Sequence, residues 1–203
     1  MIRLVLDGCK VDILPIVQGL ADEAESVEKH YGDYEAYCIT LGLDGVTALA
    51  HRDSIEDYEV SELDLVYATR LSAFGEVRFP CPAFCRLVDL CEQDGLKPIP
   101  LDMTDDEFTD LYTSTVGVTE FIKEHRLAKK GMKKRFDMSS PEVFVKGWDA
   151  YINKVRGYKR LAEAREKHIA EQILDLPRYR RSVMVVAEME RVEGIVKRIE
   201  GSA

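Results

Sequence analysis

The sequence predicts an α/β protein with a largely parallel sheet flanked by helices, and three observations lead to this prediction. Strand-like and helix-like periods alternate along the first half of the chain, as in βαβ units. Helical patterns dominate the second half. A late apolar run, Val183-Met184-Val185-Val186, is typical of a strand that is buried on both faces. We therefore expect right-handed crossovers, a helix-rich second half and a late return strand.

The first elements follow from local periodicity. Residues 2–6 form a short β-type run that ends at Asp7-Gly8. Residues 14–30 carry apolar side chains at helical spacing, so a helix is expected there. Residues 35–41 predict a second strand before a turn at residues 42–45, and the apolar run at residues 63–69 predicts a third strand.

Proline and glycine positions define the next helix. Pro82 suits the first turn of a helix that reaches Asp94, and Gly95 suits its C-terminus. Residues 97–101 return as a strand that ends at Asp102.

The remaining elements are helices, apart from the late strand at residues 181–187. Thr104 caps an acidic first turn, and Ser140-Pro141-Glu142 starts another helix. The other expected helices are residues 118–135, a long amphipathic helix at residues 153–176, and a closing helix at residues 189–199. The 203 residues are expected to form a single α/β domain, residues 1–203, with a helical region at residues 104–176 within it.

Composition indicates a cytoplasmic protein. An acidic residue at position 7 interrupts any secretory signal, and no apolar run approaches the length of a bilayer, so no membrane contact is expected. The five cysteines are an odd number, which fits reduced thiols. Asparagine occurs once and glutamine three times, a composition like that of thermophile proteins.

Charge is distributed unevenly along the chain. The net charge is −9, but residues 1–122 carry −17 and residues 123–203 carry +8. The acidic first part and the basic second part are expected to complement each other, either within one fold or between the copies of a homo-oligomer. Nucleic-acid binding through residues 123–135 and 178–181 is the less favoured alternative, because the basic residues are interleaved with acids and lack aromatic platforms.

Ligands of parallel sheets usually bind beyond the carboxyl ends of the strands. The segments expected there are residues 7–10, residues 40–42, Asp102 and residues 188–191. Arg165 falls on the apolar stripe of the long helix, where a guanidinium needs a carboxylate, a carbonyl or an anionic ligand. An internal ion pair that docks the helix is favoured over a ligand contact. Asp102 is expected to act as a base, a metal ligand or a partner of Arg165, or to cap the next helix.

Motifs for metal or cofactor chemistry are absent from the sequence. Cys81 and Cys85 stand one helical turn apart, but no second ligand pair with suitable spacing accompanies them. The four histidines form no zinc-binding pair, and the glycine-rich phosphate loops and the serine-hydrolase elbow do not occur. No metal and no cofactor is therefore expected.

The order of elements resembles the TraB/PrgY-like superfamily, which includes Tiki-type metalloproteases and, more distantly, erythromycin esterase and ChaN-like proteins. The family pattern strand-Gly-Thr-x-His is matched by the segment from Leu6 to Lys10, and the Glu-Leu of its second strand by Thr40-Leu41. Asp102 matches the Asp that ends a later strand, and Arg165 matches an Arg on the long helix. The last family unit, strand-Gly-x-Gly-His, is matched by the segment from Val185 to Arg191.

The resemblance implies that cations replace both family histidines, at Lys10 and Arg191, and that Thr40 replaces the glutamate. A divalent metal would lose its ligands, so the first hypothesis is a non-catalytic or diverged member that binds a small anion or a protein partner. Its ligand-binding residues would be Lys10, Thr40, Arg165 and Arg191. The alternative hypothesis is a hydrolase that uses Asp102 with Glu188 or Glu190.

Overall fold

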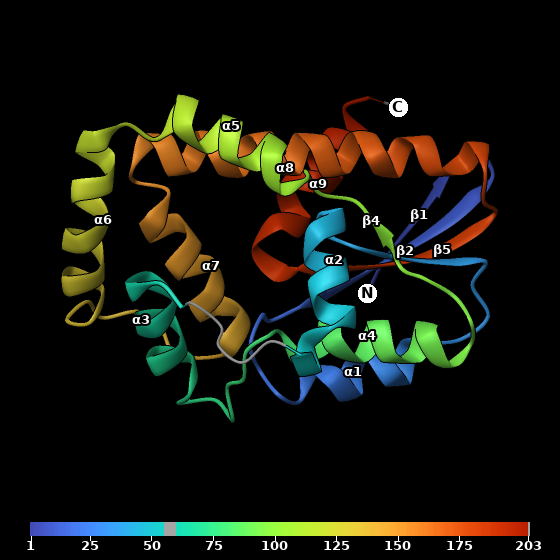
Figure 1. Ribbon diagram of the computed structural model, residues 1–203, viewed down its shortest axis with the longest axis horizontal. Coiled ribbons are helices and arrows are strands. Elements are labelled where there is room, and N and C mark those ends of the chain that lie inside the picture. Colours follow the sequence, from blue (N-terminus) through green and yellow to red (C-terminus); the bar gives the residue numbers. More distant parts are fainter. Residues whose placement is uncertain (55–59, 203) are drawn as a thin grey trace.

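The computed structural model describes residues 1–54 and 60–202, except for the side chains of residues 118–122 and 124. It contains a five-stranded sheet with the order β1-β2-β5-β3-β4 (Figure 1). Strand β1 is antiparallel to β2, and the other neighbouring strands are parallel. The predicted fold class is confirmed. The strands are β1 (Ile2–Leu6), β2 (Cys9–Ile16), β3 (Ala36–Ile39), β4 (Ile99–Pro100) and β5 (Ser182–Glu188).

The late strand β5 lies in the middle of this sheet, between β2 and β3. Its residues from Val183 to Ala187 are all inaccessible to solvent, as the continuous apolar run predicts. Successive side chains along a strand point to opposite faces of the sheet. Val183 and Val185 pack in one core cluster, while Met184 and Val186 pack in another. The last residue of β5, Glu188, reaches the carboxyl edge of the parallel strands next to Ile16 of β2.

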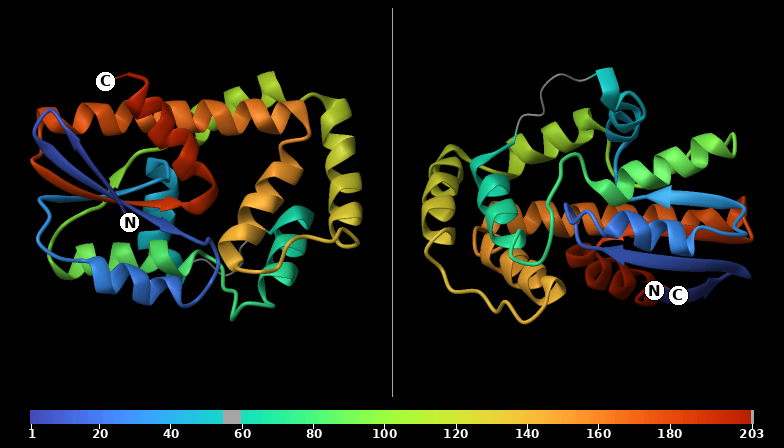
Figure 2. Two further views of the ribbon diagram at one scale, coloured as in Figure 1. Left: turned by 180° about the vertical axis from the view of Figure 1, so that it is seen from behind. Right: turned by 90° about the horizontal axis from the view of Figure 1, so that it is seen from below.

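Helices cover both faces of the sheet (Figure 2). The first core cluster lies under α8 (Arg156–Asp175) and α9 (Met189–Glu200). The second lies under α1 (Glu23–His30), α2 (Leu43–Ala50) and α4 (Pro82–Gln93). The closing helix α9 buries one apolar stripe, Val192, Ile195 and Ile199, at the spacing that faces a core.

A third core cluster lies beyond the carboxyl edge of the sheet. Val17, which follows β2, packs there with aromatic side chains such as Phe144 and Trp148. The helices that build this layer are α3 (Glu62–Leu71), α6 (Val118–Gly131) and α7 (Pro141–Ile152), while α5 (Asp105–Thr115) lies against α8. Two short 3-10 turns, Arg52–Ser54 and Leu176–Arg178, complete the described elements.

Helix starts follow the capping signals of the sequence. Thr104 and Glu107 form a capping box at the start of α5, in which Thr104 Oγ1 accepts from the Glu107 amide and the Glu107 carboxylate accepts from the Thr104 amide. Ser140 caps α7 by accepting from the Val143 amide. Gly95 follows α4 with a φ of 68°, which a residue without a Cβ adopts at low cost.

The helix expected at residues 14–30 is wrong in its first part. Residues 9–16 form β2, which is hydrogen-bonded between β1 and β5, and α1 starts only at Glu23. Residues 11–14 are all buried, because β2 is covered on both faces. The apolar run from Ile13 to Val17 fits either a helix or a buried strand locally, and pairing with β5 decides between them.

Two further expectations are corrected. The strand expected at residues 63–69 is helix α3, which begins after Ser61, whose hydroxyl accepts from the Asp64 amide. Val66, Tyr67 and Leu71 are its buried residues, and this capping and packing outweigh the β propensity of the run. The turn expected at residues 42–45 is instead the start of helix α2, with Gly42 at the N-cap and residues 43–45 in the first turn. No helix in the described part of the chain is long and apolar enough to cross a membrane.

Candidate functional site

A buried ion-pair network lies at the carboxyl edge of the parallel strands. Arg165 on α8 donates from Nε to Oδ2 of Asp102 over 2.7 Å, and from Nη2 to Oε1 of Glu188 over 3.3 Å. Thr40 is fully buried and donates its hydroxyl to the other oxygen of Glu188. Four of the residues that the sequence singles out therefore meet in one place, which we call the Arg165 network.

The topology explains this convergence. Thr40 follows β3, Asp102 stands just beyond β4 and Glu188 ends β5, so parallel pairing brings all three to the same edge. Asp102 does not cap α5, because Thr104 does so. The second carboxylate oxygen of Asp102, Oδ1, instead accepts from the Met103 amide over 2.9 Å.

The charges of the Arg165 network stabilise one another. Burial opposes the charged form of Arg165, but Glu188 and Asp102 outweigh it and hold the pKa of the guanidinium above its ordinary value. The side chains of Asp102 and Glu188 are only 6% and 5% exposed, so both carboxylates depend on this one cation. The internal ion pair that the sequence favours for Arg165 is present.

Arg191 belongs to a second ion-pair network, on the α9 side. It donates to Glu166 on α8 over 3.2 Å and to Asp149 on α7. Arg198 binds the other oxygen of Glu166 over 2.8 Å. Like Arg165, Arg191 is already held by two carboxylates.

Lys10 does not join these residues. It stands at the start of β2 and pairs in register with Ser182 at the start of β5, whereas Glu188 lies at the opposite end of that strand. The Lys10 ammonium is 3.0 Å from Asp12 Oδ2. Residues 7–10 link two antiparallel strands, so they lie at the amino edge of the parallel strands. The expectation that Lys10 and the two arginines line one site is wrong.

Strand β2 also ends at the carboxyl edge. Its end falls within residues 14–30, where the sequence predicts a helix. The segment Val17-Gln18-Gly19 follows β2 at this edge. Gly19 has a φ of 100°, and a Cβ built there would meet Val77 at 3.3 Å. Recognition of residues 11–16 as a buried strand would have pointed to Gln18.

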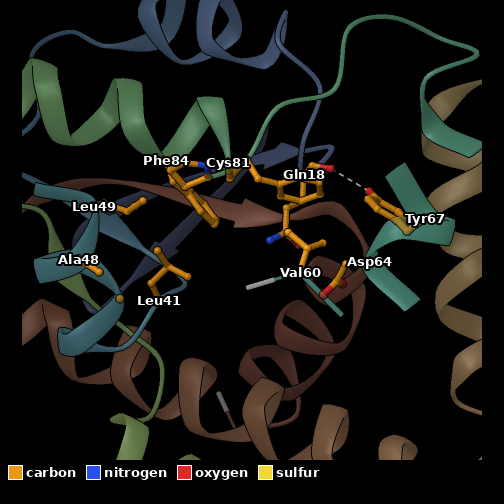
Figure 3. Close-up of a pocket in the computed structure, with 12 residues that line it drawn as sticks. Gln18, Leu41, Ala48, Leu49, Val60, Asp64, Tyr67, Cys81 and Phe84 are labelled. Atoms are coloured by element: carbon orange, nitrogen blue, oxygen red, sulfur yellow. Dashed lines mark hydrogen bonds between the residues drawn. The ribbon is translucent and has the colours of Figure 1, made fainter. Parts of the chain in front are cut away.

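Gln18 lines a pocket of about 300 Å3, the carboxyl-edge pocket, which Figure 3 shows. Leu41, Leu49 and Phe84 contribute apolar side chains on one side of the pocket, Asp64 and Tyr67 lie on the other side, and Val60 lies between the two groups. Tyr67 donates its hydroxyl to the Gln18 carbonyl over 2.9 Å. Sequence patterns gave no signal for this pocket, because its wall comes from α2, α3 and α4 as well as from two strand ends.

Cys81 lies in the wall of the same pocket at the start of α4. Burial raises the pKa of its thiol to about 12, although the Phe84 and Gly19 amides act in the opposite direction. Cys85 is half-buried, and burial also raises the pKa of its thiol. Both thiols are therefore protonated near neutral pH, which does not fit a reactive nucleophile.

The divalent metal that the family resemblance implies does not fit the Arg165 network. A guanidinium lies between the two carboxylates, and Thr40 offers a hydroxyl where the family has a glutamate. Among the described residues, no three His, Cys, Asp or Glu side chains are grouped so that they could hold a metal ion. The side chains are arranged for ion pairing.

Of the three carboxylates considered for catalysis, Glu190 is the exception. Asp102 and Glu188 are bound to Arg165, whereas Oε2 of Glu190 is buried and has no hydrogen-bond partner in the described part of the chain. Burial and the neighbouring Glu188 raise the pKa of Glu190 to about 7, against the opposing effect of Arg191. Glu190 is thus the least compensated of these three carboxyl groups.

The two basic segments considered for nucleic-acid binding lie at opposite ends of the molecule. Helix α6 forms one end, and residues 178–181 precede β5 at the other end (Figures 1 and 2). Arg178 is paired with Asp175 at 2.6 Å. These segments do not make one continuous basic surface.

Comparison of the chain with protein-family models, with characterised proteins and with solved structures finds no match.

Proposed function

We propose that this chain is a non-catalytic small-molecule-binding protein, a diverged relative of the TraB/PrgY-like superfamily, whose ligand occupies the carboxyl-edge pocket. The single observation that carries the proposal is the position of this pocket. It holds about 300 Å3 beside the ends of β2 and β3, where parallel sheets usually bind ligands.

The Arg165 network supports the family relationship. The resemblance matches Thr40, Asp102, Arg165 and the end of the last strand to family positions that are far apart in the sequence. Arg165 is hydrogen-bonded to Asp102 and to Glu188, and Thr40 is hydrogen-bonded to Glu188, whereas the matched Lys10 and Arg191 lie outside this network. Such convergence is expected if the chain keeps the family fold.

The same network argues against catalysis. A general base needs a carboxylate that is free to take a proton, and a metal needs a set of uncompensated ligands. Asp102 and Glu188 are both engaged with Arg165. In this proposal, the former catalytic cluster has become a structural clamp between α8 and the sheet edge.

The charge balance changes the expected ligand from an anion to a mainly apolar molecule. Arg165 and Arg191 are each bound by two carboxylates, so neither offers an uncompensated positive charge. The carboxyl-edge pocket is instead lined mostly by apolar and aromatic side chains, with Gln18 and Asp64 as polar groups. A small aromatic ring with one hydrogen-bond donor fits this lining.

Binding of 4-fluorophenol, followed by 19F NMR, tests the proposal. Ala48 lines the pocket from α2, so Ala48→Leu fills part of it and should weaken binding about tenfold or more. Ala50→Leu is the matched control, because it makes the same change on the same helix at a residue that does not line the pocket. The control should bind 4-fluorophenol like the wild type.

Two results would contradict the proposal. One is the absence of saturable binding for 4-fluorophenol and also for 4-fluorobenzyl alcohol and 4-fluorotoluene. The other is hydrolysis of p-nitrophenyl acetate or p-nitrophenyl phosphate, with or without Zn²⁺ or Mn²⁺, that disappears in Asp102→Asn. We expect the wild type to hydrolyse both substrates no faster than Asp102→Asn does.

A further inference from the structure

A second cavity, of about 200 Å3, lies among α5, α7, α8 and α9, and we call it the Glu190 cavity. It shares no lining residue with the carboxyl-edge pocket. Three aromatic side chains line it, Phe108, Trp148 and Tyr158. Aromatic faces carry partial negative charge and attract cations.

Glu190 stands out among the charged residues that line this cavity. Its Oε2 atom is buried without a hydrogen-bond partner among the described residues, which is costly for a carboxylate. A ligand that brings an N–H donor would supply the missing partner.

The other charges of the wall are already matched. Arg165 is bound by Asp102 and Glu188, and Arg191 is bound by Asp149 and Glu166. With Glu190 ionised, these two guanidinium groups therefore face five carboxylates, and Arg198, which binds Glu166, adds a third cation. An anion entering this cavity would meet excess negative charge, whereas a cation would reduce it.

We propose that the Glu190 cavity binds a small organic ammonium ion, which donates a hydrogen bond to the Glu190 carboxylate and faces the aromatic wall. The volume sets the size of the ligand. An apolar cavity of about 150 Å3 holds benzene in another protein, so a benzyl-sized amine is a suitable probe. This inference concerns a site separate from the one in the proposed function.

The protonation of Glu190 gives the proposal a pH signature. The groups that face Glu190 are Glu188 before α9, Arg191 on α9, Asp149 on α7, Arg165 on α8 and Tyr67 on α3. Because its pKa is about 7, Glu190 must lose a proton to bind a cation at low pH. Affinity for an ammonium ion should therefore rise about tenfold between about pH 6 and about pH 8.

Isothermal titration calorimetry with three probes of similar size tests this inference. Benzylammonium should bind, whereas benzyl alcohol should bind at least about tenfold more weakly and benzoate should not bind. Glu190→Gln keeps the size of the side chain and removes its charge, so it should abolish the preference for benzylammonium and the pH dependence. Glu193→Gln, an exposed site on the same helix, is the matched control and should leave both unchanged.

The outcomes distinguish this inference from the proposed function. Glu190→Gln should still bind 4-fluorophenol, and Ala48→Leu should still bind benzylammonium. Equal affinities for benzylammonium and benzyl alcohol, or tighter binding of benzoate, would overturn the ammonium site. Benzylammonium binding that survives in Glu190→Gln with its pH dependence intact would also overturn it.

Discussion

The Nε atom of Arg165 donates to Oδ2 of Asp102 over 2.7 Å, which ties the middle of α8 to the end of β4. Because Glu188 binds the same guanidinium, one cation compensates two buried carboxylates. Removal of one partner from such a group leaves uncompensated buried charge, whereas the intact group adds little net stability.

Arg165→Met should therefore lower the free energy of unfolding by about 3–5 kcal/mol. Urea denaturation followed by circular dichroism measures this loss. Arg160→Met is the control, because Arg160 is exposed on the same helix and should change stability by less than about 0.5 kcal/mol. Equal effects of the two substitutions would contradict a structural role for the Arg165 network.

Glu190 should make stability fall as pH rises. Its folded pKa of about 7 lies above its ordinary value of 4.5, so the folded state binds more protons than the unfolded state between these values. The contribution of Glu190 to the free energy of unfolding is fully present below the ordinary pKa of 4.5. It is lost as pH rises through about 7, at up to about 1.4 kcal/mol per pH unit. Urea denaturation of wild type and Glu190→Gln at several pH values measures it.

The difference in stability between Glu190→Gln and wild type should therefore grow from about pH 5 to about pH 7 and then stay constant. Glu193→Gln should show no such trend, because Glu193 is exposed. A constant difference across this range for Glu190→Gln would show that the residue does not titrate there.

Gly42 should tolerate no side chain. A Cβ at this position would lie far inside van der Waals contact with the carbonyl of Met103, and two backbone segments cannot yield as a flexible side chain can. Gly42→Ala should cost about 2 kcal/mol or more, as measured by thermal or urea unfolding. It should also weaken 4-fluorophenol binding, because Leu41 beside it lines the carboxyl-edge pocket.

Gly45→Ala is the matched control for Gly42→Ala. Its new Cβ would lie 3.5 Å from Leu41 Cβ, an ordinary contact, and Gly45 lies within α2. Alanine favours a helix over glycine by up to about 1 kcal/mol, so this variant should be as stable as the wild type or more stable. A loss equal to that of Gly42→Ala would refute the proposed clash.

The five cysteines should react slowly in the folded protein. All are free thiols, and burial raises the pKa of each, to about 11 for Cys91 and to about 12 for Cys38 and Cys81. At about pH 8 few thiolates form, so reaction with Ellman's reagent should be slow until urea unfolds the chain. Cys85 is the least buried, and Cys85→Ser should remove the fastest phase. Rapid reaction of Cys81 would contradict this prediction.

Much of the fold follows from local sequence. The apolar run of β5 marks a strand buried on both faces, and Pro82 and Gly95 around α4 and Thr104 with Glu107 at α5 are interactions within a few residues, so local patterns predict all of them. The convergence of Asp102 and Glu188 was also predictable, because parallel strands end at one edge. For these features the sequence by itself determined the outcome.

Tertiary structure decided the features that depend on long-range pairing. Residues 11–16 fit a helix or a strand until β5 pairs with them, and this pairing puts Lys10 at the amino edge and Gln18 at the carboxyl edge. The carboxyl-edge pocket and the buried Oε2 atom of Glu190, which has no hydrogen-bond partner among the residues that the structure describes, likewise depend on helices that are distant in the chain. Burial and charge compensation are sums over neighbours in space, so a periodic pattern in one segment cannot specify them.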